Sequence, residues 1–203
     1  ALIRKKSEDR KSGFQTSVLR MALKDSNPDT KISGEEKLAS KSNYIKGNDP
    51  KKWHYGVTNY RKVRYKEVYP GIDLVYYGNQ KKLEYDFIVQ PGVDPKAIQI
   101  GFQGANEIEI DEDGDLNIHL AGGQVFFHAP VIYQEIDGKR KSVSGNYVLT
   151  DDDKVAFALG QYDTTEPLII EPVLGFSNFL SGETLAHKGV PRHENNNSSK
   201  GNK

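Results

Sequence analysis

Two carboxylates in the strand-like run 82–89 are the first residues whose types and spacing could support catalysis. Glu84 and Asp86 are two residues apart, so a β-strand would carry both on one face, roughly 7 Å from each other. Most glycosidases use a pair of carboxylates at such distances, and they need the pair inside a cleft. Charged residues on the solvent face of a half-buried strand are the more common arrangement. We therefore expect no enzymatic activity, and a glycan-active enzyme is the weaker alternative.

An acidic run later in the chain offers oxygen ligands in a pattern that could bind calcium. Asp111, Asp113 and Asp115 have the spacing of positions 1, 3 and 5 of an EF-hand loop. The match ends there, because Leu116 stands where the loop needs glycine and Gly122 stands where it needs glutamate. A tight hairpin turn explains the same residues without a metal. The sequence predicts no cofactor, with calcium at this run as the weaker candidate.

Other catalytic and metal-binding patterns are weak or missing. None of the five histidines has the spacing of a helical zinc site; they are His54, His119, His128, His187 and His193. His119 and His128 could face each other across a hairpin, which we interpret as a surface cross-strand pair. The sequence contains no cysteine, which excludes disulfides and thiolate metal sites. It also lacks nucleophile elbows, P-loops and dinucleotide-binding fingerprints.

Aromatic side chains are the remaining candidates for a binding site. Trp53 and Tyr55 lie in a loop-like stretch, and Tyr76 and Tyr77 lie in an apolar run. Tyrosine and tryptophan combine an apolar ring with a polar edge, which suits contact with sugars or proteins. Because Tyr76 and Tyr77 are adjacent, a strand would direct one into the core and the other outward. We take these four residues as the candidate ligand-binding set; packing inside a sheet is the alternative for their rings.

Strand alternation dominates the elements that must position these residues. Apolar and charged residues alternate in the run 82–89, and similar short runs recur between residues 18 and 174. Turn signals separate them; examples are Pro70-Gly71, Pro91-Gly92, Asp113-Gly114 and Asp137-Gly138. The sequence therefore predicts an all-β fold, an antiparallel β-sandwich or distorted barrel of about a dozen short strands.

The predicted domain has ragged ends. We expect a β-sandwich domain over residues 14–180, a disordered or partial segment at 1–13 and a disordered polar tail at 181–203. Residues 25–42 are rich in Lys, Ser, Asp and Glu and predict a long loop. One helical turn is expected at residues 94–97, capped by Asp94. No apolar stretch approaches the length of a membrane span, so no membrane insertion is expected.

Charge is unevenly distributed along a chain whose formal net charge is zero. Residues 1–66 hold 17 Lys and Arg against 7 Asp and Glu, whereas residues 67–172 hold 7 against 19. Basic strands that pair with acidic strands across one sheet would explain this pattern, so we expect no nucleic-acid binding. Head-to-tail self-association is the weaker alternative, and the oligomeric state stays open.

Five segments, taken in chain order, carry a family resemblance; they are residues 42–53 (SNYIKGNDPKKW), 68–79 (VYPGIDLVYYGN), 83–92 (LEYDFIVQPG), 111–116 (DEDGDL) and 130–140 (PVIYQEIDGKR). They resemble the N-terminal domain of large bacterial secreted proteins with SBBP-type β-propeller repeats, over roughly residues 18–180. The resemblance implies an extracellular, β-rich domain without an assigned activity. In that family a segment like 172–180 leads into propeller blades. Here a polar tail follows it, so the chain resembles a member without the propeller.

The lack of a catalytic motif predicts a non-catalytic module, and the resemblance implies that it belongs to a bacterial exported protein and works outside the cell or on its surface. Its expected work is structural or is contact with other surface proteins or glycans, ahead of β-propeller repeats. A carbohydrate-binding module that uses exposed Trp and Tyr is the alternative. A flat, exposed row of those rings would favour this alternative, and buried rings would contradict it.

Overall fold

A computed structural model of the protein describes residues 2–5, 15–79, 82–150 and 154–175. Its elements are β-strands apart from two single 3₁₀ turns, and the strand pairs are antiparallel. Two open sheets form a sandwich-like arrangement, so the all-β prediction is confirmed. Among the described residues, no helix is long and apolar enough to cross a membrane.

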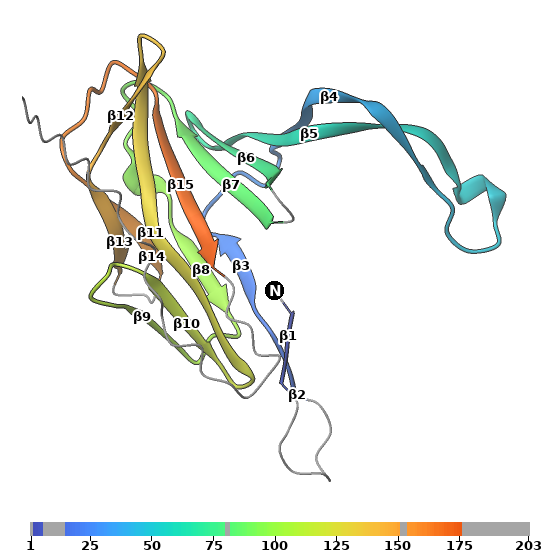
Figure 1. The fold of residues 1–203 in the computed structure, drawn as a ribbon, viewed down its shortest axis with the longest axis horizontal. Coiled ribbons are helices and arrows are strands. Elements are labelled where there is room, and N and C mark those ends of the chain that lie inside the picture. The colour runs from blue at the N-terminus through green and yellow to red at the C-terminus, as the bar shows by residue number, and fades with distance from the viewer. Residues whose placement is uncertain (1, 6–14, 80–81, 151–153, 176–203) are drawn as a thin grey trace, which may run out of the picture.

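The larger sheet has nine strands in the order β4-β5-β6-β7-β15-β11-β10-β9, with β12 paired to β11 (Figure 1). These strands are β4 (Lys31–Tyr44), β5 (His54–Tyr69), β6 (Ile72–Asn79), β7 (Lys82–Val89), β9 (Glu107–Ile110), β10 (Leu116–Leu120), β11 (Gly123–Ile136), β12 (Lys139–Ser142) and β15 (Leu168–Gly175). Sequence neighbours pair along most of the sheet, while β15 is inserted between β7 and β11.

The smaller sheet has four strands in the order β13-β14-β8-β3. They are β3 (Arg20–Leu23), β8 (Ile100–Gln103), β13 (Gly145–Leu149) and β14 (Val155–Leu159). A separate two-stranded pair joins β1 (Leu2–Lys5) to β2 (Gln15–Val18). The tail predicted at 181–203 lies outside the described residues.

The core lies between the two sheets. Phe87 and Ile170 of the larger sheet are completely buried, as is Val155 of the smaller one. The rings of Phe87 and Phe157 meet across the layers, with 6.1 Å between their centroids. Each such side chain contributes roughly 1.5–3 kcal/mol by leaving water. The alternation of buried and exposed residues therefore fixes the register of the central strands.

The predicted turns occur where the sequence placed them. Gly71, Gly92 and Gly138 have φ values of 72°, 74° and 70°, which glycine adopts without steric cost. The expected helical turn is the 3₁₀ turn η2 (Pro95–Ala97), and the Asp94 side chain accepts a hydrogen bond from the Lys96 amide at 3.0 Å.

The long loop predicted over residues 25–42 is wrong, because most of it belongs to the 14-residue strand β4. We call residues 31–66 the arm: β4, its turn and most of β5, which together project away from the sandwich (Figure 1). No residue from 31 to 67 is buried, so the segment lacks the apolar alternation that marks the other strands. Its backbone ladder, and not a core, gives it strand structure.

The strand register shifts at two places that flank the root of the arm. The register of β4 against β5 shifts between Lys37 and Lys41, next to Glu36 with a φ of 53°. The register of β5 against β6 shifts between Tyr65 and Tyr69, around Glu67, which also has a φ of 53°. Such bulges bend and twist a ribbon locally. They account for an arm that leaves the plane of the sheet.

Candidate functional site

The arm exposes large apolar side chains that a sandwich would normally cover. Tyr55 is 61% exposed, Ile45 is 59% exposed and Tyr44 is 57% exposed, all near the tip. Between the tip and Lys62, β4 is the one described strand that pairs with β5, because β6 pairs with β5 only from Lys62 to Tyr69. Exposed apolar groups gathered on one projecting element are typical of an interaction site.

The tip of the arm is ordered by local hydrogen bonds. The 3₁₀ turn η1 (Pro50–Lys52) begins at Asp49, whose side chain accepts a bond from the Lys51 amide at 3.1 Å. The indole N–H of Trp53 donates to the carbonyl of Gly47 at 3.1 Å. Trp53 follows the turn, whereas the loop-like assignment of Tyr55 is wrong because Tyr55 lies in β5. The Trp53 ring is therefore held in place by the backbone around it.

The arm also carries a large excess of positive charge. Residues 31–66 contain ten Lys and Arg and three Asp and Glu. Three of the basic residues form ion pairs in the described part of the chain: Arg61, Lys62 and Arg64. The other seven are exposed and have no ion-pair partner among the described residues; they are Lys31, Lys37, Lys41, Lys46, Lys51, Lys52 and Lys66.

Pairing between basic and acidic strands accounts for little of the charge asymmetry. Among the described residues, a single ion pair joins the basic region 1–66 to the acidic region 67–172. It is the contact of Arg64 Nη1 with Asp73 Oδ2 at 3.0 Å. The interpretation of the charge pattern as cross-sheet pairing is therefore wrong for most of these residues.

Arg64 anchors the root of the arm. Its guanidinium also binds the carboxylate of Glu35 on β4, and this hydrogen bond lowers the pKa of Glu35 below its ordinary value. Asp73 on β6 accepts a second bond from the Glu67 amide at 2.8 Å. Three strands are thus tied together at the bulge where the arm leaves the sheet. This arrangement fixes the direction of the arm relative to the sandwich.

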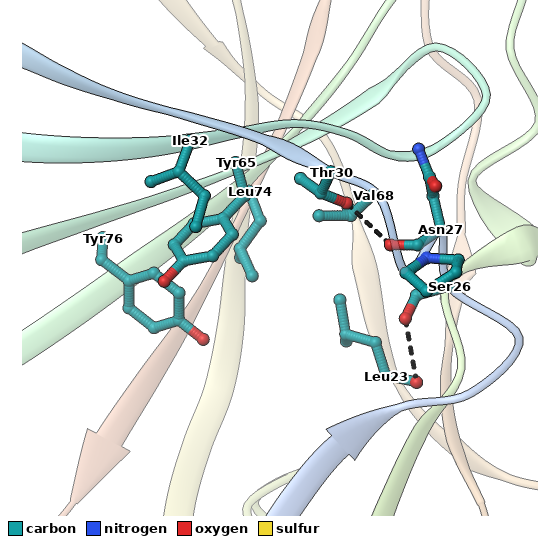
Figure 2. A pocket seen from close by; sticks show the side chains of 10 residues that line it. Leu23, Ser26, Asn27, Thr30, Ile32, Tyr65, Val68, Leu74 and Tyr76 are labelled. Carbon is teal, nitrogen blue, oxygen red and sulfur yellow. Dashed lines mark hydrogen bonds between the residues drawn. The ribbon is translucent and has the colours of Figure 1, made fainter.

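A half-open pocket lies at the same root, on the inner face of the larger sheet (Figure 2). Its volume is about 400 Å³, and its lining includes Leu23, Ile32, Tyr65, Val68 and Tyr76. The rings of Tyr65 and Tyr76 meet edge to face, with 5.7 Å between their centroids. The walls combine these apolar side chains with the polar residues Ser26, Asn27 and Thr30.

The opposite, outer face of the larger sheet carries a carboxylate cluster. The Tyr77 hydroxyl donates to Asp86 Oδ1 at 2.8 Å. Burial, together with the nearby carboxylates of Glu171 and Glu84, raises the pKa of Asp86 to about 6, against the Tyr77 hydrogen bond and Lys62, which lower it. Burial and Asp86 raise the pKa of Tyr77 as well. This face therefore concentrates negative charge on a half-buried surface.

The structure separates the four residues of the candidate ligand-binding set. Trp53 and Tyr55 lie at the arm tip, Tyr76 points into the root pocket, and Tyr77 lies on the outer face with Asp86. Adjacent residues on β6 thus point to opposite faces, and no common platform forms. Asp86 lies with Tyr77 on the outer face of the sheet. Glu84 is two residues before Asp86 on β7 and therefore lies on the same face. Neither carboxylate lines the root pocket or a second pocket beside Asp94 and Tyr162.

The acidic run 111–115 uses its carboxylates to build a turn. Asp111 Oδ1 accepts the amides of Asp113 at 3.1 Å and Asp115 at 2.9 Å, and its Oδ2 accepts from Asn117. Asp115 in turn binds His128 Nδ1 at 2.8 Å. Among the described residues, no three His, Cys, Asp or Glu side chains are arranged to hold a metal ion.

The predicted pairing of two histidines across the hairpin is wrong. Leu120 pairs with Gly123, so His119 lies opposite Gln124 and not opposite His128. His119 Nε2 instead contacts Glu109 at 3.0 Å on the neighbouring strand. Each histidine therefore has a carboxylate as its partner, and the two rings form no shared site.

Sequence reasoning did not identify the arm lysines as a candidate binding surface, and it did not identify the root pocket. The excess of lysine over acid in residues 31–66 was a readable signal for the arm. The pocket had no such signal, because its lining comes from segments far apart in the chain, such as Leu23, Ile32 and Tyr76.

Comparison with known proteins identifies the family but assigns no activity. A family model described as a domain of unknown function, DUF7948, matches residues 2–173. No curated protein and no solved structure matches the chain. The match covers both sheets and the arm, from β1 through most of β15. The chain belongs to the DUF7948 family.

Proposed function

We propose that this domain is a non-catalytic interaction module whose arm contacts an acidic partner surface. One observation carries the proposal: the projecting arm, which has no buried residue, displays seven exposed lysines beside exposed tyrosines. Isolated two-stranded ribbons are marginally stable in water, and the like charges on this one repel each other. Docking on an acidic surface would cover the rings and neutralise the lysines.

We further propose that the module is exported and works outside a bacterial cell or on its surface, ahead of β-propeller repeats. The support is the resemblance of five ordered segments to the N-terminal domain of secreted SBBP-type proteins. In that setting the sandwich would serve as the base that positions the arm. Detection of the protein in a cytoplasmic fraction of its native cells, and not at the surface, would contradict this location.

A carbohydrate-binding module is the second candidate function. The exposure of Tyr55 and the nearby indole of Trp53 favour it, because rings beside polar edges suit sugars. Tyr76 and Tyr77 add nothing to such a surface, since they lie on opposite faces of β6 far along the chain from the tip. The positive charge of the arm favours an acidic macromolecular surface over a neutral glycan.

Fluorescence of Trp53, the single tryptophan, tests the two candidates. We expect poly-L-glutamate, a simple acidic probe, to change the emission at low salt and to lose this effect at high salt. A variant with Lys41→Glu and Lys46→Glu should respond at least tenfold more weakly. A response to a neutral polysaccharide and none to poly-L-glutamate would overturn the proposal in favour of carbohydrate binding. Release of new reducing ends from that polysaccharide would instead indicate an enzyme.

A further inference from the structure

We propose that the arm of one copy docks on the outer face of the larger sheet in a second copy, so that the chain self-associates through complementary charge. This inference rests on the proposed function, because it names the partner that the arm contacts. It assigns the basic and aromatic surface of the arm to the face that carries Tyr77, Asp86 and Glu171.

Within the part of the chain that the structure describes, most of the charge of the arm has no ion-pair partner. The arm projects away from the sandwich (Figure 1), and its seven exposed lysines have no ion-pair partner among the described residues. Lys62, at the root, lies near enough to lower the pKa of Asp86. The lysines near the tip, such as Lys41 and Lys46, therefore remain available to another molecule.

The outer face has the matching chemistry. Asp86 and Glu171 make no ion pair with a described basic residue, and their mutual repulsion contributes to the raised pKa of Asp86. An ammonium group placed between them would relieve that repulsion. The same face already accommodates one cation, because the Arg140 guanidinium lies 4.2 Å from the ring centre of Tyr133.

Charge balance favours a second copy over an unrelated acidic partner. The formal charge of the chain is zero, although residues 1–66 and 67–172 differ strongly in sign. Each copy thus offers both a donor and an acceptor surface. A reciprocal dimer would use the contact twice, which doubles the buried area, whereas a one-way contact would propagate into chains. The exposed rings of Tyr44 and Tyr55 add apolar contact to either arrangement.

Sedimentation velocity of the full chain at low and at high salt tests the inference. At low salt we expect a species larger than the 22.8 kDa monomer that grows with concentration over a range of about a hundredfold. In about 1 M salt, where charges are screened beyond about 3 Å, it should dissociate. A monomer at every concentration in low salt overturns the inference, and so does an association that high salt leaves unchanged.

Charge-reversal variants locate the contact. The arm variant Lys41→Glu with Lys46→Glu, and the face variant Glu171→Lys, should each raise the dissociation constant by about tenfold or more. Mixed together, they should associate again, because the reversed arm then meets the reversed face. The control variant Lys96→Glu with Lys139→Glu makes the same change in net charge at exposed positions outside the arm and should associate like the wild type. Equal loss in this control, or no recovery in the mixture, contradicts the assigned contact.

The two proposals fail separately. A monomeric wild type that still responds to poly-L-glutamate through Trp53 would retain the arm as an interaction element and exclude the second copy as its partner. A monomeric wild type without that response would remove both. Circular dichroism of each variant checks that the sheets are intact before either conclusion is drawn.

Discussion

The sandwich and the arm are held together by different forces, although both are antiparallel β-structure. The sandwich buries a continuous cluster that includes Phe87, Ile118 and Phe157. The arm has no buried residue between 31 and 67 and depends on the β4–β5 ladder and on the Arg64 anchor. A core specifies one structure by packing, whereas a ladder alone leaves its side chains to solvent.

This difference indicates what each region is for. Residues in the sandwich lie where burial requires them, and their types follow from the fold. Residues such as Lys41, Tyr44 and Tyr55 on the arm gain little for the fold, because their side chains remain exposed. Exposed apolar groups on a ribbon without a core are better explained by contact with a partner. Four substitutions test the comparison, from the largest expected effect to the smallest.

Phe87→Ala should cause the largest loss. Phe87 is completely buried and contacts the rings of Tyr85 and Phe157 from the two sheets. Truncation leaves a cavity at the centre of the sandwich, so the free energy of unfolding should fall by about 4 kcal/mol. Urea denaturation followed by far-UV circular dichroism measures it. A loss below about 1 kcal/mol would show that the sheets do not depend on this core.

Gln134→Leu should cost about 2–3 kcal/mol, because it removes partners from buried polar groups. Gln134 is completely buried on β11. Its Nε2 donates to the carbonyl of Asp163 at 2.7 Å, and its Oε1 accepts the Asp163 amide at 2.9 Å. The same substitution at exposed Gln103 serves as the control and should change stability by less than about 0.5 kcal/mol. Equal effects at both positions would contradict a structural role for this hydrogen-bonded clamp.

The sequence allowed prediction of the sandwich because burial leaves a local pattern. The alternation in residues 82–89 predicted β7, and Pro70-Gly71 predicted the turn between β5 and β6. The arm left no such pattern, since both faces of β4 contact solvent. Its strand structure comes from pairing with β5, whose partner residues lie as far away in the sequence as Tyr65 is from Ile32. Local reasoning does not detect a strand of this kind.

The candidate site shows the same division. Adjacency alone predicted that Tyr76 and Tyr77 point to opposite faces, as they do. The environment of Asp86 could not be predicted, because Glu171 reaches it from β15, a strand far along the chain. The position of β15 between β7 and β11 is a property of the topology and not of any segment.

Asp86→Asn should stabilise the protein at pH 7, on the order of 1 kcal/mol after allowance for solvent screening. The carboxylates of Glu171 and Glu84 repel the charged form of Asp86, whereas Lys62 and the Tyr77 hydroxyl stabilise it. Because its folded pKa of about 6 exceeds the ordinary 3.8, the folded state binds the proton more tightly. The free energy of unfolding of the wild type should therefore fall as the pH rises from about 4 to 6.

Urea titrations at several pH values measure this effect. The Asp86→Asn variant should lack the decline between pH 4 and 6 that the Asp86 carboxyl contributes in the wild type. The exposed residue Asp113 provides the control, and Asp113→Asn should keep the wild-type profile over this range. A variant that is less stable than the wild type at pH 7 would mean that the charged Asp86 is favourable on this face, which contradicts the crowding of carboxylates.

Tyr55→Ser should have the smallest effect on stability, within about 0.5 kcal/mol, because its ring is 61% exposed. Far-UV circular dichroism of the sandwich should show an unchanged unfolding midpoint, while self-association in low salt becomes weaker as apolar contact is lost. Trp53 reports on the arm alone, so its emission separates local opening of the arm from unfolding of the sandwich. A loss above about 1 kcal/mol would break the comparison, because the arm would then be a structural part of the sandwich. An unchanged midpoint with weaker association would support the distinction between sandwich and arm. The Tyr55 ring would then contribute to contact with the partner and not to folding.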